Sequence, residues 1–314
     1  MRSPLSRRAL LLLGASGAGA ALLSGCGLRL DTPPDVPTLD ATEQLRNRIA
    51  AILEATTAAD DDPETAGEDL QKFTAAIGPI WSPPSEMATE PPPSEGPRTY
   101  VEAAEEISSA VFEATAALDP SLAPVLVDVA TGLTLTAGTV KAQIVSTADE
   151  LIRDSRDSGS RDSGSADTSD EGEGEDISKS WKAVLDQARA ASYGYERLAV
   201  NFDSKSPERK SAVARLESLG SLTGEMLEKL GESKTGQGAP AWRLDPSPTS
   251  ADTARELALN LEDALASAIL PWLQADSLAT LRLWESARAR TAFAAAQALR
   301  FTSPGDGGDA EAEQ

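Results

Sequence analysis

Residues 181–202 read WKAVLDQARAASYGYERLAVNF, and the spacing of apolar side chains in this stretch decides the fold class. The residues that recur every three or four positions are Trp181, Val184, Leu185, Ala188, Ser192, Tyr195, Ala199 and Phe202. This period places them on one face of an α-helix, whereas a strand would alternate its side chains between two faces. The stretch therefore predicts an amphipathic helix that buries this face.

The same helical period continues through the rest of the chain. In the first half it covers Leu45–Leu53, Leu70–Ile77, Ile107–Leu118 and one long run, Leu122–Ile144, in which Val140 is an apolar position. In the second half it covers residues 181–202, Val213–Leu230, Leu257–Trp272 and Leu281–Leu299. No segment alternates with period two, so the sequence predicts an all-α protein with four helices in each half.

Two helix boundaries carry local signals. Ser206 followed by Pro207 is typical of a helix start, because a serine caps free amides and proline fits the first helical position. Pro271 predicts that the seventh helix kinks or ends near Leu270, since proline removes a backbone donor.

Residues 153–177, RDSRDSGSRDSGSADTSDEGEGEDI, contain almost no apolar side chain. Such a segment buries too little surface to offset its ordering entropy, so we predict a disordered acidic Ser/Gly linker. It separates an N-terminal helical domain, 40–152, from a second domain, 178–302. The tail 303–314 is rich in Gly and acidic residues and is predicted to be disordered.

The two domains resemble each other at one junction between helices, which reads LDPSL at 118–122 and QADSL at 274–278. We interpret this as two tandem four-helix bundle-like units. The alternative is a convergence of alanine-rich helical hairpins.

The N-terminus has the layout of an export signal, so residues 1–25 are predicted to be a signal peptide. Arg7 and Arg8 lie in its basic region and precede an apolar stretch of 15 residues, 9–23, that is too short for a convincing membrane span. The adjacent arginines resemble a twin-arginine signal, which exports folded proteins. An ordinary signal that happens to contain two arginines is the alternative.

Leu23, Ser24, Gly25 and Cys26 resemble a bacterial lipobox, which implies that the cysteine is lipidated and becomes the first mature residue. Two acyl chains anchor stably, at about 0.8 kcal/mol per buried methylene. Residues 26–39, with three prolines, are predicted to be a semi-rigid stalk. We therefore expect a protein held on the extracytoplasmic face of the cell membrane. The alternative is that Cys26 is a small residue at an ordinary cleavage site.

The chain is strongly acidic, with a net charge of −22, and the mature form loses three arginines but no acid. This charge disfavours nucleic acid as a partner. Two explanations of the acidic charge are equally good: it keeps the protein soluble, or it binds cations or basic partners. No second cysteine exists for a disulfide.

Residues 181–301 contain a recognisable set of features. They are ASYGY at 191–195, Arg209 and Arg215, Gly231, APAW at 239–242, Leu257–Leu265 around Glu262, and the alanine-rich 282–300 closed by Pro304 and Gly305. With these features the segment resembles a ferritin-like domain family of unknown function found in actinobacterial exported proteins. The resemblance implies a four-helix bundle and no established activity.

Ferritin-like di-iron sites need Glu-x-x-His motifs, and this chain has no histidine. The Glu-His pair that we associate with the family falls on Ala188 and Arg189, so we predict no metal and no cofactor. Four carboxylates on different helices are conceivable cation ligands, but they lie beside the apolar stripes and are interpreted as solvated flank: Glu196, Glu217, Glu262 and Glu285.

No catalytic set is found, because serine, cysteine and metal hydrolases usually rely on a histidine base. Of Tyr193 and Tyr195, which point to different faces, one is predicted to lie in the core and the other to be exposed. Trp81, Trp242, Trp272 and Trp284 are interpreted as packing anchors rather than a ligand cage. We therefore expect a non-enzymatic envelope protein with a protein partner or an assembly role. The alternative is a bundle that binds a small ligand or a divalent cation.

The anchor is tested by the substitution Cys26→Ala. Because the thiol is the only acceptor for the lipid, we expect the variant to enter the aqueous fraction or to persist as an uncleaved precursor. Labelling with radioactive palmitate and membrane fractionation measure this. Undiminished lipid labelling of the variant would disprove the assignment.

Overall fold

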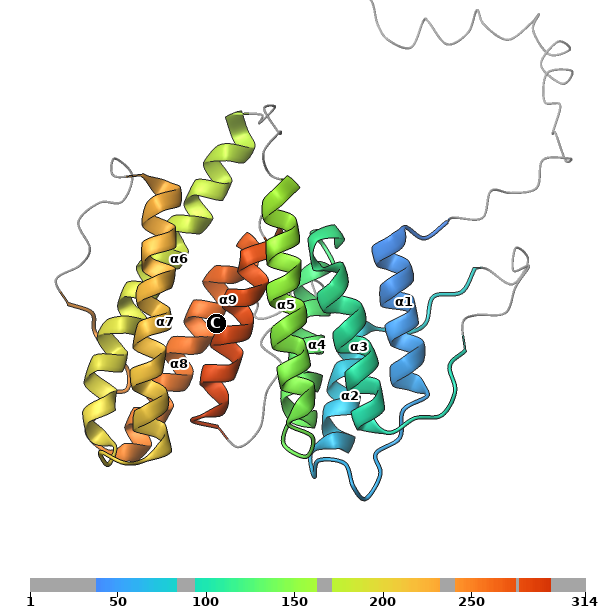
Figure 1. Cartoon of the computed structure of the whole chain (residues 1–314), viewed down its shortest axis with the longest axis horizontal. Coiled ribbons are helices and arrows are strands. Elements are labelled where there is room, and N and C mark those ends of the chain that lie inside the picture. The colour runs from blue at the N-terminus through green and yellow to red at the C-terminus, as the bar shows by residue number, and fades with distance from the viewer. Residues whose placement is uncertain (1–37, 84–93, 163–170, 232–240, 275–276, 295–314) are drawn as a thin grey trace, which may run out of the picture. The chain divides into compact units, whose positions relative to one another are not determined.

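The computed structural model describes residues 38–83, 94–162, 171–231, 241–274 and 277–294, with the side chains of 156–176, 274 and 277 left out. Within these ranges it contains α-helices and short 3₁₀ turns but no strand (Figure 1). The helices are α1 (Ala41–Glu54), α2 (Ala66–Ile77), α3 (Tyr100–Ala114), α4 (Ala123–Ala137), α5 (Gln143–Asp162), α6 (Glu171–Leu198), α7 (Pro207–Leu230), α8 (Ala251–Ile269) and α9 (Ser277–Thr291). The predicted all-α class is confirmed.

Side-chain caps fix several helix starts. Asp40 and Thr99 each form a reciprocal capping box, with Glu43 and Glu102 respectively, which satisfies amides that have no partner inside the helix. The predicted start of α7 is confirmed, since the Ser206 side chain accepts from the Arg209 amide and Pro207 is the first helical residue.

The predicted end of the seventh helix is also confirmed. Helix α8 stops at Ile269, and Leu270–Gln274, which contains Pro271, forms a 3₁₀ turn. Trp272 in this turn is buried.

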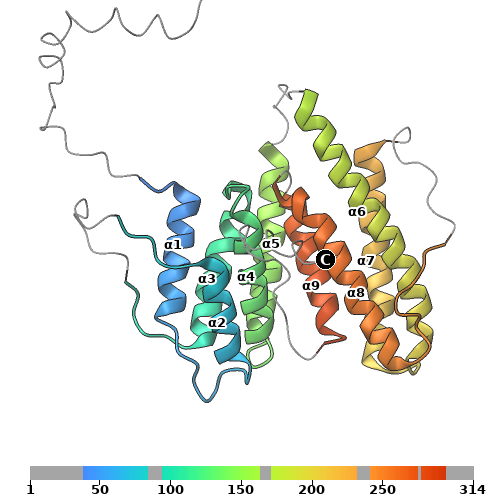
Figure 2. The same ribbon diagram turned by 180° about the vertical axis from the view of Figure 1, so that it is seen from behind.

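The prediction of one long fourth helix over 122–144 is wrong. The run is divided into α4 and α5 by a turn at 138–142, and Val140, a predicted stripe residue, is 50% exposed. A Cβ on Gly138 would lie 2.4 Å from Cγ2 of Val145, so only glycine lets α5 begin this close to the end of α4. Figure 2 shows the two helices side by side.

The phase predicted for the 213–230 helix is wrong by one position. Val213 is 48% exposed, and the buried face of α7 consists of Ala212, Arg215, Leu219, Leu222, Met226 and Leu230. This face includes an arginine, which a search for apolar periodicity passes over.

The helix ends on both sides of the predicted linker 153–177 extend into it. Helix α5 continues to Asp162 and α6 begins at Glu171, while residues 163–170 lie outside the described residues. The backbone of these two parts is thus helical, where irregular chain is predicted from composition. Helical hydrogen bonds propagate at little cost from an existing helix, which gives a physical reason for the extensions.

Helix α6 packs against α7 and α8, and α9 packs against both of these (Figure 1). In the first half, α3 packs against α4 and α5, and α2 against α1 and α4. Helix α9 also contacts α4 and α5, and one hydrophobic core runs through all of these helices.

Three contacts join α9 to the first half. The rings of Phe112 and Trp284 meet edge to face, 5.8 Å apart. The Trp284 indole donates to Asp149 Oδ1 at 2.7 Å, and Arg288 Nη1 reaches both oxygens of Asp149, at 2.8 and 2.7 Å. Ring contact and charge-assisted bonds therefore act together at this junction.

No described helix has both the length and the apolar character needed to cross a bilayer. The predicted signal peptide, residues 26–37 of the stalk and the tail 303–314 lie outside the described residues.

The packing of α4 is tested by Gly132→Ala. A Cβ there would lie 2.8 Å from the ring of the buried Phe73, so we expect a loss of about 1–3 kcal/mol in the free energy of unfolding. Gly224→Ala in α7 is the control, because open space surrounds this position and the added methyl should stabilise by about 0.5–1 kcal/mol. Urea denaturation measures both, and equal effects of the two substitutions would contradict the prediction.

Candidate functional site

The second half contains a buried ion pair between α7 and α8. The guanidinium of Arg215 donates through Nε to Glu262 Oε1 at 2.9 Å and through Nη2 to Oε2 at 2.8 Å. The Tyr195 hydroxyl, from α6, donates to the same Oε1 at 2.7 Å. Glu262 is 0% exposed and Arg215 is 5% exposed, so three helices meet at one desolvated carboxylate.

The pair keeps the Arg215 guanidinium charged inside the core. Burial alone would lower the pKa of Arg215, but the Glu262 carboxylate and its hydrogen bonds outweigh this and raise that pKa above its ordinary value. Both carboxylate oxygens accept from Arg215, which leaves Glu262 poorly placed to act as a base or a cation ligand.

A second arginine extends the network toward the surface. Arg282, on α9, donates to both oxygens of Glu225, with Nε 3.0 Å from Oε2, and its Nη1 lies 2.7 Å from Glu285 Oε2. Ser218 connects the two arginines, since its hydroxyl accepts from Arg215 and donates to Glu285. Burial would lower the pKa of Arg282, yet Glu225 and Glu285 raise it overall.

The structure does not bring the four candidate carboxylates together. Glu196 and Glu217 are exposed, whereas Glu262 and Glu285 are paired with arginines. The interpretation of Glu262 as solvated flank is wrong, because Arg215 compensates its charge and permits burial. In the described part of the chain, no group of three or more histidine, cysteine, aspartate or glutamate side chains is placed to hold a metal ion.

Tyr195 is fully buried, as predicted for one of the two tyrosines. Tyr193 is partly exposed, and its ring meets that of Trp242 in a tilted arrangement with 5.7 Å between the ring centroids. Trp272 and Trp284 are among the largest fully buried side chains. Trp81 is partly exposed, and its backbone amide donates to Asn47 Oδ1.

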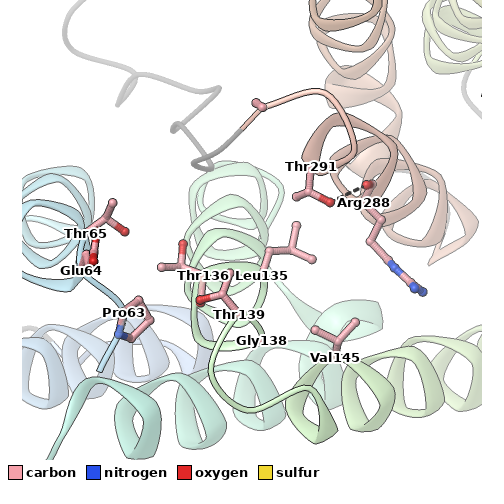
Figure 3. Close-up of a pocket in the computed structure, with 11 residues that line it drawn as sticks. Pro63, Glu64, Thr65, Leu135, Thr136, Gly138, Thr139, Val145, Arg288 and Thr291 are labelled. Atoms are coloured by element: carbon pink, nitrogen blue, oxygen red, sulfur yellow. Dashed lines mark hydrogen bonds between the residues drawn. The ribbon is translucent and has the colours of Figure 1, made fainter. Parts of the chain in front are cut away.

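A polar pocket of about 570 Å³ lies where the start of α2, the end of α4 and the end of α9 meet (Figure 3). Its polar lining includes four threonines, Thr65, Thr136, Thr139 and Thr291, together with Glu64 and Arg288. We call it the threonine pocket. Apolar lining comes from Pro63, Leu135 and Val145.

Behind this pocket lies a buried carboxylate, Asp69, which is 2% exposed. It accepts from Thr65 Oγ1 at 3.0 Å and from Thr136 Oγ1 at 3.3 Å, and Lys72 Nζ is 3.8 Å away. Burial, with the nearby carboxylates of Asp69 and Asp62 adding to it, raises the pKa of Tyr100 far above its ordinary value, so this phenol stays protonated.

The residues singled out at the N-terminus, Arg7, Arg8, Leu23, Ser24, Gly25 and Cys26, lie outside the described residues. The threonine pocket and the roles of Arg282, Arg288 and Asp149 were not predicted. Their only sequence signal is arginine spacing along α9, which is compatible with many surface helices.

The described residues thus define an all-helical protein with a buried charge network and several pockets. One is the threonine pocket, and another is a cavity lined by Asp149, Glu225, Arg282 and Glu285. Comparisons with protein-family models, with curated proteins and with solved structures found no match to this chain.

The ion pair is tested by Arg215→Met, alone and combined with Glu262→Gln. The single substitution leaves a buried carboxylate without its cation and should cost about 3–5 kcal/mol in unfolding free energy. The double variant should recover a large part of this, because a neutral amide still accepts from Tyr195. Urea denaturation gives both values.

Arg255→Met is the matched control. Arg255 pairs with Glu208 at 2.8 Å in a partly exposed position, so its loss should cost less than about 1 kcal/mol. A loss at Arg215 as small as at Arg255 would contradict the role given to the buried pair.

Proposed function

We propose that this protein is a lipid-anchored lipoprotein of the cell envelope, and that its helical body acts by binding another envelope component or by serving an assembly role, without catalysis. The anchor is the lipid on Cys26, behind a signal peptide with a twin-arginine character. The N-terminal sequence supports this localisation, and the body supplies the binding surfaces.

The distribution of polar groups between core and surface supports the proposed binding role. The charges deepest in the second half pair with one another, as Glu262 does with Arg215 and Glu225 with Arg282. The threonine pocket is instead lined by four threonines beside Glu64, Arg288 and apolar side chains. Hydroxyl groups and a cavity of this size are typical of small-molecule recognition sites.

We further propose that α6–α9 form a ferritin-like four-helix unit, preceded by a second helical unit in tandem. Support comes from the packing of α6 with α7 and α8 and of α9 with the same two helices. The Arg215–Glu262 pair would then occupy the centre of the unit, where di-iron members of the ferritin-like class place their metal ligands.

The alternative function is the binding of a divalent cation or small ligand, without a di-iron centre. The acidic net charge favours a cation in general terms. The geometry of the four candidate carboxylates disfavours a divalent ion there, because Glu262 and Glu285 are paired with arginines.

Metal analysis of the mature protein purified from its native host separates these possibilities. We expect divalent metal well below one ion per chain. A stoichiometric metal would overturn the non-metal proposal. The variant Glu196→Gln with Glu217→Gln serves as a matched control, since unchanged metal content in it would place the ion away from these exposed carboxylates.

A further inference from the structure

We propose that the threonine pocket binds a small organic cation that carries N–H groups, such as a primary amine or a diamine. The inference rests on the alternative function given above, the binding of a small ligand, and adds the chemical class of that ligand. The pocket lies between segments that are far apart in the sequence, Pro63–Thr65, Leu135–Thr139 and the end of α9 (Figure 3).

Every threonine hydroxyl of the pocket already donates its proton in a hydrogen bond to another group of the protein. Thr65 and Thr136 both donate to Asp69 Oδ2, at 3.0 and 3.3 Å. Thr139 donates to the carbonyl of Thr136, and Thr291 to the carbonyl of Arg288, both at 2.7 Å. In each of these bonds the hydroxyl is the donor, and a carboxylate or carbonyl oxygen accepts.

What these hydroxyls can still offer to a ligand is therefore lone pairs. A threonine hydroxyl has one proton and two acceptor positions, so the four residues together form an acceptor surface. Two backbone amides at the same place are also engaged, since Gly138 donates to the Thr134 carbonyl and Thr139 to the Thr136 carbonyl. A ligand that matches this surface must supply hydrogen-bond donors.

The charges that line the pocket favour a cation. Glu64 lines the pocket, is exposed, and has no ion pair or hydrogen bond with any described residue. Arg288 is the cationic residue among the described lining residues, and its guanidinium points away from the threonines in Figure 3 and is bound by both oxygens of Asp149. The pocket thus presents one available negative charge and favours a positive ligand.

The lining and the size of the pocket fit an organic cation better than a metal ion. Calcium and magnesium are held by several oxygen ligands in which carboxylates predominate, whereas Glu64 is the acidic residue among those lining this pocket. A volume of about 570 Å³ also suits a small molecule better than a bare ion. Pro63, Leu135 and Val145 provide apolar surface for a short methylene chain.

The test is calorimetric titration of the detergent-solubilised, full mature protein with 1,4-diaminobutane. We expect saturable binding that Glu64→Gln weakens about tenfold, equivalent to about 1.4 kcal/mol. Thr139→Val, at an exposed hydroxyl, should also weaken it. Glu68→Gln is the matched control, because Glu68 is an exposed carboxylate of α2 outside the pocket and should leave the affinity unchanged.

Titrations with tetramethylammonium, acetate and calcium test which chemical groups of the ligand the pocket recognises. Tetramethylammonium, which is cationic but has no N–H group, should bind more weakly than the diamine, and acetate should not bind. The inference is overturned if the diamine shows no saturable binding, or if Glu68→Gln weakens binding as much as Glu64→Gln. It is also overturned if calcium binds with higher affinity than the diamine and Glu64→Gln weakens the binding of calcium. These outcomes are independent of the lipid labelling of Cys26→Ala and of the metal analysis, which test the proposed function separately.

Discussion

The bidentate pair between Arg215 and Glu262 is the interaction on which the second half of the structure depends. A carboxylate without exposure to water is tolerated only with a compensating cation and satisfied oxygens, and Arg215 and Tyr195 supply both. Because these three residues lie on α7, α8 and α6, their geometry fixes the rotation of each helix about its axis. The apolar residues then fill the space that this arrangement leaves.

Features encoded by neighbouring residues were predictable from the sequence. Helical periodicity, the Ser206–Pro207 start of α7 and the end of α8 before Pro271 each depend on side chains within one or two turns. The exception is the turn between α4 and α5. Gly138 is compatible with a helix when considered alone, and only the close approach of Val145 reveals why a turn forms there.

The features missed have partners that are remote in the sequence. Arg215 lies in a helix whose face can be read in two phases, and Glu262 decides between them from a different helix. The threonine pocket is a stronger case, since residues 65, 136, 139 and 291 share no local pattern. The hydrogen-bond direction of each hydroxyl depends on the tertiary structure as well, for example where both Thr65 and Thr136 face Asp69.

The contacts of α9 with Asp149 and Phe112 have a consequence for the order in which the chain acquires its structure. Helix α9 is the last described helix to leave the ribosome, yet it covers side chains of α3 and α5, which are made much earlier. Until α9 has been made, Phe112 lacks its ring partner and Asp149 lacks the donors Trp284 and Arg288. The N-terminal helices therefore complete their packing only after α9 has been synthesised, and a product truncated before α9 would expose an unfinished core.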